Sequence, residues 1–573
     1  MSKLLKYLGK YKKESILAPF FKLIEVAFEL IVPLVVASII DNGIENGDKA
    51  YIVKRCAVLG LLGVLGLCCA LVAQYFSAKA AVGFSTDIRH ALFEHIGKLS
   101  FSQLDSLGAP TLITRLTGDI NQVQTGTNLT LRLVLRSPFV VFGAVAMAFT
   151  VDTRSSLVFV VAVPLLAAVV FAIMLVCIPM YRKVQQKLDI LLSKTRENLL
   201  GTRVIRAFCK EDEEIADFDE KNRALTQMQT AVGRISAFMN PATFVLINFA
   251  IIALIYVGAL RVKSGSISQG DVVALYNYMS QILVELIKLA NLIISVTKAI
   301  ACGNRIQSVL DIEPGTVSGT VTDGDTDSDY AVEFKNACLS YGGGEESLHD
   351  VNLRIKRGCT LGVIGSTGSG KSSLVNLIPR FYDVTGGRVL VDGVDVRDYD
   401  TRALRSKIGV VSQKKSLFAG TVRDNIRFGN ADATDEEILQ ALDTAQARQM
   451  VEEKRGGLDF ELEQDGKNLS GGQRQRLTIA RALVRKPEIL ILDDAASALD
   501  YATGAALSKA LRNTDFSPTV ITVSQRVAAI RNADVIVVLD EGEIVGTGCH
   551  EELLKRCEVY REICASQLER EGA

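Results

Sequence analysis

The sequence predicts an all-α membrane domain of six spanning helices with long cytoplasmic helical extensions, followed by an α/β domain. Two observations lead to this fold class. The mean hydropathy of the 573 residues is +0.25, which is high for a soluble protein. Long apolar stretches also fill the chain up to about residue 312, whereas short β-rich runs alternating with helical patterns follow from about residue 330. A chain of this length is expected to hold more than one domain.

Composition excludes several classes of function. The 64 Lys and Arg residues balance the 64 Asp and Glu residues, so the chain lacks the basic surface that nucleic-acid binding needs. The 11 cysteines form no CxxC pair and there are only four histidines, which argues against a disulfide framework, a zinc module or a histidine-based metal site. The early lysines end at Lys13 and precede an apolar stretch that itself carries charges, so we expect no cleavable signal peptide.

Six stretches are apolar enough to cross about 30 Å of hydrocarbon. In chain order they are 15–40, 56–78, 129–151, 155–181, 235–260 and 271–297. An even number of spans places both chain ends on one side, and the lysines before the first span predict that this side is cytoplasmic. The chain is therefore expected to be an integral membrane protein with its N-terminus and its C-terminal domain in the cytoplasm.

The connections between the spans alternate in length. The predicted outer loops, 41–51, 152–154 and 261–270, are short. The inner connections, 79–128 and 182–234, are long, charged and rich in helix formers. They predict helices that continue beyond the membrane, where about 20 extra residues project about 30 Å. Something in the cytoplasm is expected to dock where these helices turn.

Charged residues lie within three of the predicted spans. Lys22, Glu25 and Glu29 fall on one face of the first span. Such charges are costly unless they are paired or face water. One interpretation is a polar substrate path or a pair between helices. The other is that Lys22 reaches the inner interface and the glutamates only support helix packing. Both stay open, and they apply equally to Glu285 and Lys288.

Residues 313–329 are rich in Gly, Thr and Asp, which predicts a linker. The chain then divides into a membrane domain at 1–312 and a second domain at 330–573.

The second domain begins its chemistry with a P-loop. The pattern G-x-x-x-x-G-K-[ST] follows the predicted strand 361–365 and opens a helix. Its glycines let backbone N–H groups surround phosphates, Lys371 reaches the β- and γ-phosphates, and Ser372 binds Mg²⁺. The candidate nucleotide-binding residues of this loop are Gly365, Ser366, Thr367, Gly368, Ser369, Gly370, Lys371, Ser372 and Ser373.

Two further motifs follow the P-loop. The apolar run ILILDD contains Asp493, whose carboxylate is expected beside the Mg²⁺. The segment NLSGGQRQRL (468–477) offers the Ser470 hydroxyl and the backbone N–H groups of two glycines. LSGGQ after a P-loop and before such a strand resembles the signature of ATP-binding-cassette (ABC) ATPases. With six preceding spans, essentially all 573 residues resemble a half-transporter of the ABC exporter family.

The resemblance implies ATP and Mg²⁺ as ligands and a P-loop ATP-binding cassette as the second domain. Tyr341 would stack on adenine, although a tyrosine of the core is the other interpretation, and Gln413 would contact Mg²⁺. Segments around 101–110 and 201–208 resemble the coupling helices that dock onto cassettes.

In the family, two cassettes pair head to tail and each ATP lies between the P-loop of one subunit and the signature of the other. The resemblance therefore implies a second ABC half-transporter as partner. The residues that would act in trans are Ser470, Gly471, Gly472 and Gln473. Ser497 to Asp500 resemble the loop that crosses the dimer interface, and Glu461 is expected to meet a coupling helix although its surroundings (460–468) depart from the family's wording.

Two positions differ from the family pattern. Asp494 stands where the family has a Glu that orients the attacking water, and Gln525 stands where it has a His. Asp is one methylene shorter, about 1.5 Å, and a misplacement of about 1 Å can cost about 100-fold in rate. The signature is intact. The pattern resembles the degenerate-site subunit of heterodimeric bacterial multidrug-type exporters, and a homodimer that tolerates both changes is the alternative.

The expected function is ATP-driven export of an amphipathic or hydrophobic substrate across a bacterial-type cytoplasmic membrane. The alternatives are a lipid flippase of the same architecture or a non-transporting membrane ATPase or regulator. Aromatic residues of the spans could line an apolar cavity suited to small amphipathic molecules and membrane lipid, or could serve helix packing. They include Phe244, Phe249, Tyr256, Tyr276 and Tyr278.

Overall fold

The computed structural model describes residues 2–325, 328–495 and 499–571. The chain forms two compact units. The first comprises Met1–Gly97 and Ala109–Ile312, and the second comprises Lys98–Gly108 and Glu313–Ala573. The short segment Lys98–Gly108 therefore belongs with the C-terminal unit, although it lies within the region that the sequence assigns to the membrane domain.

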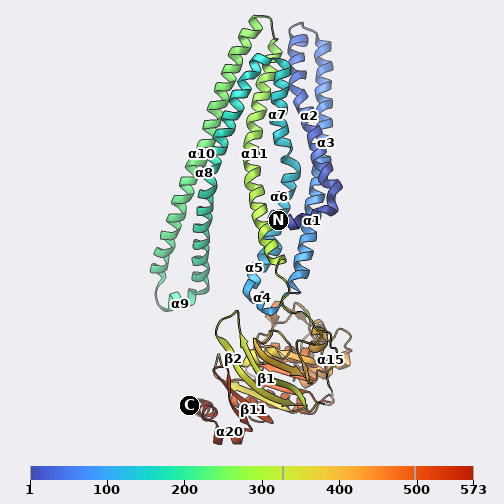
Figure 1. The fold of residues 1–573 in the computed structure, drawn as a ribbon, viewed down its shortest axis with the longest axis vertical. Coiled ribbons are helices and arrows are strands. Elements are labelled where there is room, and N and C mark those ends of the chain that lie inside the picture. Colours follow the sequence, from blue (N-terminus) through green and yellow to red (C-terminus); the bar gives the residue numbers. More distant parts are fainter. Residues whose placement is uncertain (1, 326–327, 496–498, 572–573) are drawn as a thin grey trace. The chain divides into compact units, whose positions relative to one another are not determined.

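The first unit is all helical and, among the residues that the structure describes, contains six helices long and apolar enough to cross a membrane, as predicted. These helical stretches are Leu5–Ile44, Lys49–Ile96, Ala109–Val151, Thr153–Leu200, Glu211–Lys263 and Gln269–Leu310. Figure 1 labels their parts, which are α1 (Leu5–Leu8), α2 (Lys12–Ser38), α3 (Lys49–Ile96), α5 (Ala109–Thr114), α6 (Ile120–Leu133), α7 (Arg136–Val151), α8 (Thr153–Leu200), α9 (Thr202–Ala207), α10 (Glu211–Lys263) and α11 (Gln269–Leu310).

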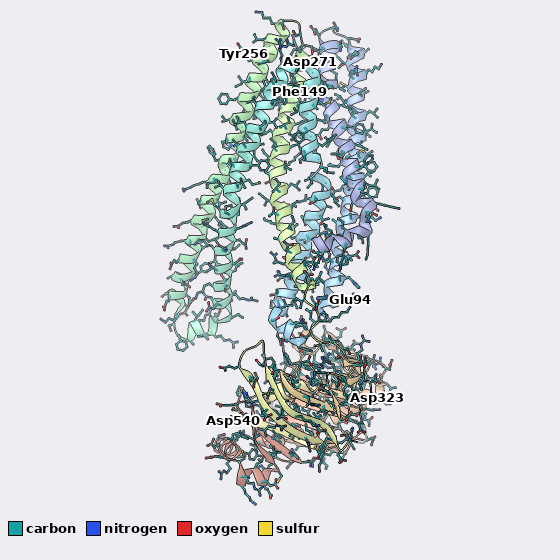
Figure 2. The ribbon with its side chains drawn as sticks, viewed as in Figure 1. Glu94, Phe149, Tyr256, Asp271, Asp323 and Asp540 are labelled. Atoms are coloured by element: carbon teal, nitrogen blue, oxygen red, sulfur yellow. The ribbon has the colours of Figure 1, made fainter. Side chains whose placement is uncertain are left out.

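Short connections with polar caps separate the helices at one end of this unit. The Asp48 side chain accepts from the Tyr51 N–H before α3 at 3.0 Å. Asp152 caps α8, and Ser268 caps α11 in a reciprocal arrangement with Asp271. These caps satisfy backbone donors that a helix start leaves without an intrahelical partner. Figure 2 shows Asp271 at the same end as Phe149 of α7 and Tyr256 of α10.

At the other end the helices are extended, as the long inner connections predicted. The 48 residues of α8 and the 53 residues of α10 run side by side and are joined by the short helix α9 (Figure 1). A helix of about 50 residues is about 75 Å long, far more than the roughly 30 Å of a hydrocarbon core. Each of these helices therefore continues well past any membrane that it spans.

Tyr278 lies at the centre of the helical core. Its side chain is fully buried, and its hydroxyl donates to the Leu30 carbonyl at 2.7 Å, which joins α11 to α2. For Tyr278, the structure therefore supports a role in helix packing rather than in lining a cavity. The other four aromatic residues of the predicted set are exposed on this chain: Phe244 by 56%, Phe249 by 67%, Tyr256 by 66% and Tyr276 by 43%.

The second unit is an α/β domain with three sheets. The main sheet has the order β12-β11-β3-β10-β9-β6, a second has the order β2-β1-β4-β5, and β7 pairs with β8. The strands are β1 (Tyr330–Ser340), β2 (Glu346–Lys356), β3 (Thr360–Gly365), β4 (Gly386–Val391), β5 (Val394–Asp395), β6 (Ile408–Val411), β7 (Gly420–Thr421), β8 (Glu461–Leu462), β9 (Ile489–Asp493), β10 (Thr519–Val523), β11 (Val535–Asp540) and β12 (Glu543–Gly548).

Helices cover the sheets of this unit. They are α4 (Phe101–Leu107), α12 (Lys371–Leu377), α13 (Thr401–Lys407), α14 (Val422–Arg427), α15 (Asp435–Thr444), α16 (Arg448–Glu452), α17 (Gly471–Leu483), α18 (Tyr501–Arg512), α19 (Val527–Ile530), α20 (His550–Arg556) and α21 (Glu558–Glu571). All five residues of β9 are buried, which explains why the four residues before Asp493 are all apolar.

The order of the main sheet brings three strand ends together. β10 lies between β3 and β9, all three are parallel, and Val523 is in register with both Val363 and Asp493. Ligands of such sheets bind beyond the carboxyl ends of the strands. The P-loop after β3, Asp493 with Asp494 at the end of β9, and Gln525 after β10 therefore share one edge.

The segment predicted as a linker belongs to the second unit and is partly bonded to the rest of it. The Gly319 N–H donates to the Tyr399 carbonyl at 2.9 Å, and the Val321 N–H donates to the Asp398 carbonyl at 3.0 Å. Residues 319–321 are thus held by backbone hydrogen bonds that the Gly, Thr and Asp composition does not reveal.

Candidate functional site

The P-loop has the backbone geometry that its glycines allow. Gly368 and Gly370 have φ of +88° and +92°, in the left-handed region that favours glycine. A Cβ at position 370 would lie 2.7 Å from the Ser347 carbonyl oxygen. Gly370 precedes α12, and no side chain caps that helix. The backbone N–H groups at this turn are therefore suited to an anionic ligand.

Lys371 is folded back onto the loop. Its Nζ donates to the Gly365 carbonyl at 3.0 Å and to the Ser366 carbonyl at 2.5 Å, and the residue is only 8% exposed. Burial lowers the pKa of Lys371, and the charges of Asp493 and Asp494 oppose that shift. Phosphate oxygens would replace the two carbonyls and compensate the buried charge.

Asp493 and Ser372 form the oxygen pair expected of a magnesium site. The Ser372 hydroxyl donates to Asp493 Oδ1 at 3.1 Å, and Asp493 is buried. Burial raises the pKa of Asp493, so a cation beside it would favour the ionised carboxylate. Among the described residues no group of three or more His, Cys, Asp or Glu side chains could hold a metal. One carboxylate, one hydroxyl and phosphate oxygens nevertheless suit Mg²⁺. Gln413 lies exposed after β6, the strand beside β9.

The two positions that depart from the family pattern lie at neighbouring strand ends. Asp494 has φ of +51°, and its backbone N–H donates to the Val523 carbonyl at 2.9 Å. Asp is among the residues that tolerate this conformation. Gln525 is exposed and follows Ser524, whose N–H donates to the Val363 carbonyl at 3.0 Å. Both side chains therefore start from backbone that the main sheet fixes.

The LSGGQ segment forms the start of α17. Ser470 caps this helix: Oγ accepts from the Gln473 N–H at 3.3 Å, and Gln473 Oε1 accepts from the Ser470 N–H at 3.0 Å. Gly471 and Gly472 form the first turn. Lys415, which sequence analysis missed, donates to the Gly471 carbonyl at 3.5 Å. The feature of the sequence that could have pointed to Lys415 is its position two residues after Gln413.

Tyr341 is partly exposed rather than a residue of the core. It is 40% exposed, and its hydroxyl donates to Ser373 Oγ at 3.0 Å. Burial of the rest of the residue raises the pKa of Tyr341. Its ring meets that of Tyr382 edge-on at 5.0 Å between centroids. The structure thus places the predicted adenine-stacking residue next to the P-loop helix.

The first predicted coupling segment forms α4 and packs on the second unit, of which it is part. Phe101 lies 4.6 Å from Phe381 between ring centroids, and the Tyr382 hydroxyl donates to Asp105 Oδ2 at 2.6 Å. Burial and this carboxylate raise the pKa of Tyr382. Gln103 also donates to the Glu313 carbonyl at 2.7 Å. Sequence analysis predicted a docking segment here but missed its aromatic partners after α12.

The second predicted coupling segment and the remaining predicted positions have the following places in the structure. The segment 201–208 forms α9, and Phe208 at its end is 73% exposed. Glu461 is exposed in β8. Ser497 lies outside the described residues, whereas Asp500 caps α18 by accepting from the Thr503 N–H at 3.2 Å.

The charged residues predicted within the first and sixth spans are paired, and Arg136 of the third span joins them. Arg136 of α7 bonds to Glu285 of α11 and, at 2.9 Å, to Glu29 of α2. Arg136 is 8% exposed and Glu285 is 3% exposed, so this pairing offsets a large desolvation cost. Two more pairs lie along single helices, Lys22 with Glu25 at 2.6 Å and Lys288 with Glu285 at 2.9 Å. The structure therefore favours pairs between and along helices for these residues.

Comparison with protein families gives matches in both units. The model of the ABC transporter transmembrane region matches residues 15–286, and the model described as ABC transporter matches residues 348–497.

Curated relatives match nearly the whole chain. An uncharacterized ABC transporter ATP-binding protein of Mycobacterium tuberculosis is 39% identical over 572 residues, covering 98% of this chain and 97% of the relative. A putative multidrug export ATP-binding/permease protein of Bacillus subtilis is 31% identical, covering 99% of each chain. An ATP-dependent lipid A-core flippase of Desulfotalea psychrophila is 33% identical, covering 82% of each.

A solved structure has the same fold. The ATP-bound structure of a bacterial Atm1-family ABC exporter matches with a TM-score of 0.80, covering 97% of this chain and 98% of that chain at 22% identity.

Proposed function

Because this chain belongs to the ABC transporter family, as an exporter with its membrane region fused to an ATP-binding cassette, we propose that it is the degenerate-site half of a heterodimer. Members of this family bind ATP, couple its hydrolysis to transport and work as dimers. The proposal adds that this chain's own P-loop holds ATP in a slow or silent site, and that its signature completes a faster site on a different half-transporter.

The observation that carries this proposal is that two departures from the family pattern, Asp494 and Gln525, occur together. Both follow strands that flank each other in the main sheet, and both belong to the site built on this chain's P-loop. Asp494 is about one carbon–carbon bond shorter than Glu, and Gln lacks the protonatable ring of His. The residues proposed to bind ATP match the family pattern. We therefore expect this site to lose hydrolysis of ATP but to keep binding it.

The P-loop residues have separate tasks in this proposal. Backbone N–H groups around Gly368 and Gly370 bind the phosphate chain. Lys371 exchanges its hydrogen bonds to the loop carbonyls for hydrogen bonds to the β- and γ-phosphate oxygens. Ser372, Asp493 and Gln413 would hold Mg²⁺. When bound, Mg²⁺ neutralises phosphate charge. Tyr341 stacks on the adenine.

Hydrolysis needs a carboxylate within reach of the attacking water. Asp494 falls about 1.5 Å short of the reach of Glu, which corresponds to a loss of about 100-fold. Ser470 and its two glycines would meet the γ-phosphate held by the partner, whose own Glu and His carry out the faster reaction.

The proposed substrate is a small amphipathic or hydrophobic molecule. One relative is named for multidrug export, and exposed aromatic residues of the spans offer apolar surface to such a molecule or to membrane lipid. The second candidate is lipid flipping, which the relative named as a lipid A-core flippase favours. A non-transporting ATPase or regulator would show no vesicle uptake that scales with ATP turnover.

The proposed location is a bacterial-type cytoplasmic membrane, with the N-terminus and the cassette in the cytoplasm. The lysines before α2 support this orientation because basic residues stay on the cytoplasmic side.

The first test is the native mass of the tagged full-length chain, extracted gently from its own membranes. One copy bound to one different ABC half-transporter is the expected result. A homodimer would overturn the heterodimer and would require Asp494 and Gln525 to support hydrolysis themselves.

A further inference from the structure

The side chain of Gln567, near the end of the C-terminal helix α21, holds the loop that follows β10. Its Nε2 donates to the Gln525 carbonyl at 2.7 Å, and its Oε1 accepts from the Val527 N–H at 2.9 Å. One planar amide thus bonds to both sides of Arg526. Because the donor and the acceptor belong to one rigid group, the two bonds fix the position and the orientation of this backbone.

The helix that carries Gln567 is itself anchored on the main sheet. Tyr560 is fully buried and Cys564 is 7% exposed, and both pack in one apolar cluster with Ile364 of β3. The Tyr560 hydroxyl is also bonded to His550 Nδ1 at 2.7 Å. Gln567 follows Cys564 by one helical turn on the same face. We call the two hydrogen bonds of Gln567 the Gln567 clamp. The helix that carries this clamp packs on the same sheet that supports the P-loop.

The loop depends on this clamp for a backbone partner. Val527 begins α19, and the residue before it, Arg526, makes no side-chain cap. The first N–H groups of a helix lack intrahelical acceptors. Gln567 Oε1 supplies an acceptor for one of these groups, the Val527 N–H. On the other side the Arg526 N–H donates to Ser524 Oγ at 3.0 Å. Gln525 is thus the exposed residue between a buried serine and the Gln567 clamp.

We propose that Gln567 is a positioning residue of the nucleotide site, which sets where the Gln525 side chain meets the γ-phosphate. This rests on the proposed function, in which Gln525 stands at the family's His position in the site of this chain's P-loop, and on the ability of its amide to donate a hydrogen bond to a γ-phosphate oxygen. Since only a nucleoside triphosphate carries a γ-phosphate, the C-terminal helix tunes the preference of this site for ATP over ADP. A residue that merely supported the fold would affect both nucleotides equally.

The test uses the full-length chain in its native complex. Gln567→Met keeps the length and helix propensity of the side chain but removes both hydrogen bonds. Ser566→Ala is the matched control, because Ser566 is exposed and its hydroxyl bonds only within α21, to the Ile563 carbonyl at 3.0 Å. Photolabelling of this chain by 8-azido-ATP, competed with ATP or ADP, reports binding at this chain's own site even beside a second subunit.

The expected result is that Gln567→Met weakens ATP binding about five- to tenfold, as loss of a hydrogen bond would, while ADP binding and the control stay at the wild-type level. Added to Gln525→Ala, the same change should have no further effect, because the two residues act in series. Equal weakening of ATP and ADP, or no change in either, overturns the inference.

Two further outcomes separate this inference from the proposed function. If Gln525→Ala leaves the preference for ATP unchanged, the proposed γ-phosphate contact fails and the inference fails with it. If Gln525→Ala lowers the preference but Gln567→Met does not, only the inference fails. Amide exchange at Val527, expected to rise about tenfold in Gln567→Met and in Gln567→Ala, tests the clamp without nucleotide, and unchanged exchange contradicts it.

Discussion

The two nucleotide-binding surfaces of the cassette, the P-loop side and the signature side, differ in completeness. On the P-loop side, Lys371, Ser372 and Asp493 lie in a connected, largely buried group, but the two residues that follow β9 and β10 depart from the family pattern. On the signature side, the segment matches the family and Ser470 forms a reciprocal cap with Gln473. In the proposed function, the first surface holds ATP and the second helps to cleave ATP bound by the partner.

If the proposal holds, binding and cleavage of ATP depend on separate residues of one site. Phosphate binding uses backbone N–H groups and one lysine, which tolerate nearby changes. Cleavage needs a carboxylate placed within about 1 Å. A single shortened side chain can therefore silence one site while leaving its nucleotide in place. The following predictions test that separation, beginning with the largest expected effect.

Lys371→Ala is expected to weaken ATP binding at this chain's site about 1,000-fold. Two charge-assisted hydrogen bonds to phosphate, each worth about 2 kcal/mol, would be lost. Photolabelling of this chain with 8-azido-ATP measures the change. Lys356→Met, at an exposed position in β2, is the control and should have no effect. Unchanged labelling of Lys371→Ala would show that this loop does not bind the phosphates.

Asp494→Glu is expected to raise ATP hydrolysis at this chain's own site by up to about 100-fold, because the longer side chain restores the reach to the attacking water. The ATPase rate of the purified complex is the measurement. Adding Lys371→Ala should cancel the gain, since it removes ATP from this site.

Asp494→Asn is the matched control for that change and should leave the rate of the complex nearly unaltered. If Asp494→Asn instead abolishes ATPase activity, Asp494 already serves as the base and the two surfaces do not differ as proposed.

Ser470→Ala is expected to lower turnover of the complex about 30-fold, because the partner's γ-phosphate loses a hydrogen bond worth about 2 kcal/mol. It also removes a helix cap, at a cost of about 1 kcal/mol of stability. Thr434→Ala removes the equivalent cap of α15, where Glu437 N–H donates to Thr434 Oγ at 3.3 Å. Steady-state ATPase and thermal unfolding of both variants separate the two effects. Equal loss of turnover in both would reduce Ser470 to a capping residue.

Tyr382→Phe should have the smallest effect, on coupling rather than on binding. It removes the 2.6 Å hydrogen bond to Asp105 of α4 but keeps the ring contacts with Phe101 and Tyr341. We expect transport per ATP hydrolysed to fall about fivefold, equivalent to about 1 kcal/mol. Uptake and ATPase measured on the same vesicles give this ratio.

The control for Tyr382→Phe is Tyr399→Phe, which also deletes a hydroxyl from the second unit, one that donates to the Val391 carbonyl at 3.1 Å. A similar loss of coupling in both variants would indicate a general effect of destabilisation rather than a role for the contact with α4.

Sequence patterns were sufficient for the elements defined by local periodicity or by short motifs. The six spans and the extended helices α8 and α10 match their predictions, and the P-loop lies between β3 and α12 as its pattern predicts, because hydrophobic length and glycine placement act within a few helical turns. For α4, the sequence predicted that the segment docks onto a cassette but not which residues it contacts. Its partners Phe381 and Tyr382 could not be inferred, because they lie more than 270 residues away along the chain.

Residue type at fixed spacing was enough to predict the P-loop, the signature and the departures at Asp494 and Gln525, because spacing decides which groups a loop can present. Tertiary structure alone decided three long-range contacts: Arg136 with Glu285, Tyr382 with Asp105, and Gln567 with the Gln525 loop. The reason is physical. The three contacts join residues that are 149, 277 and 42 positions apart in the chain, in that order. They depend on how whole helices pack, which no local pattern of side chains specifies.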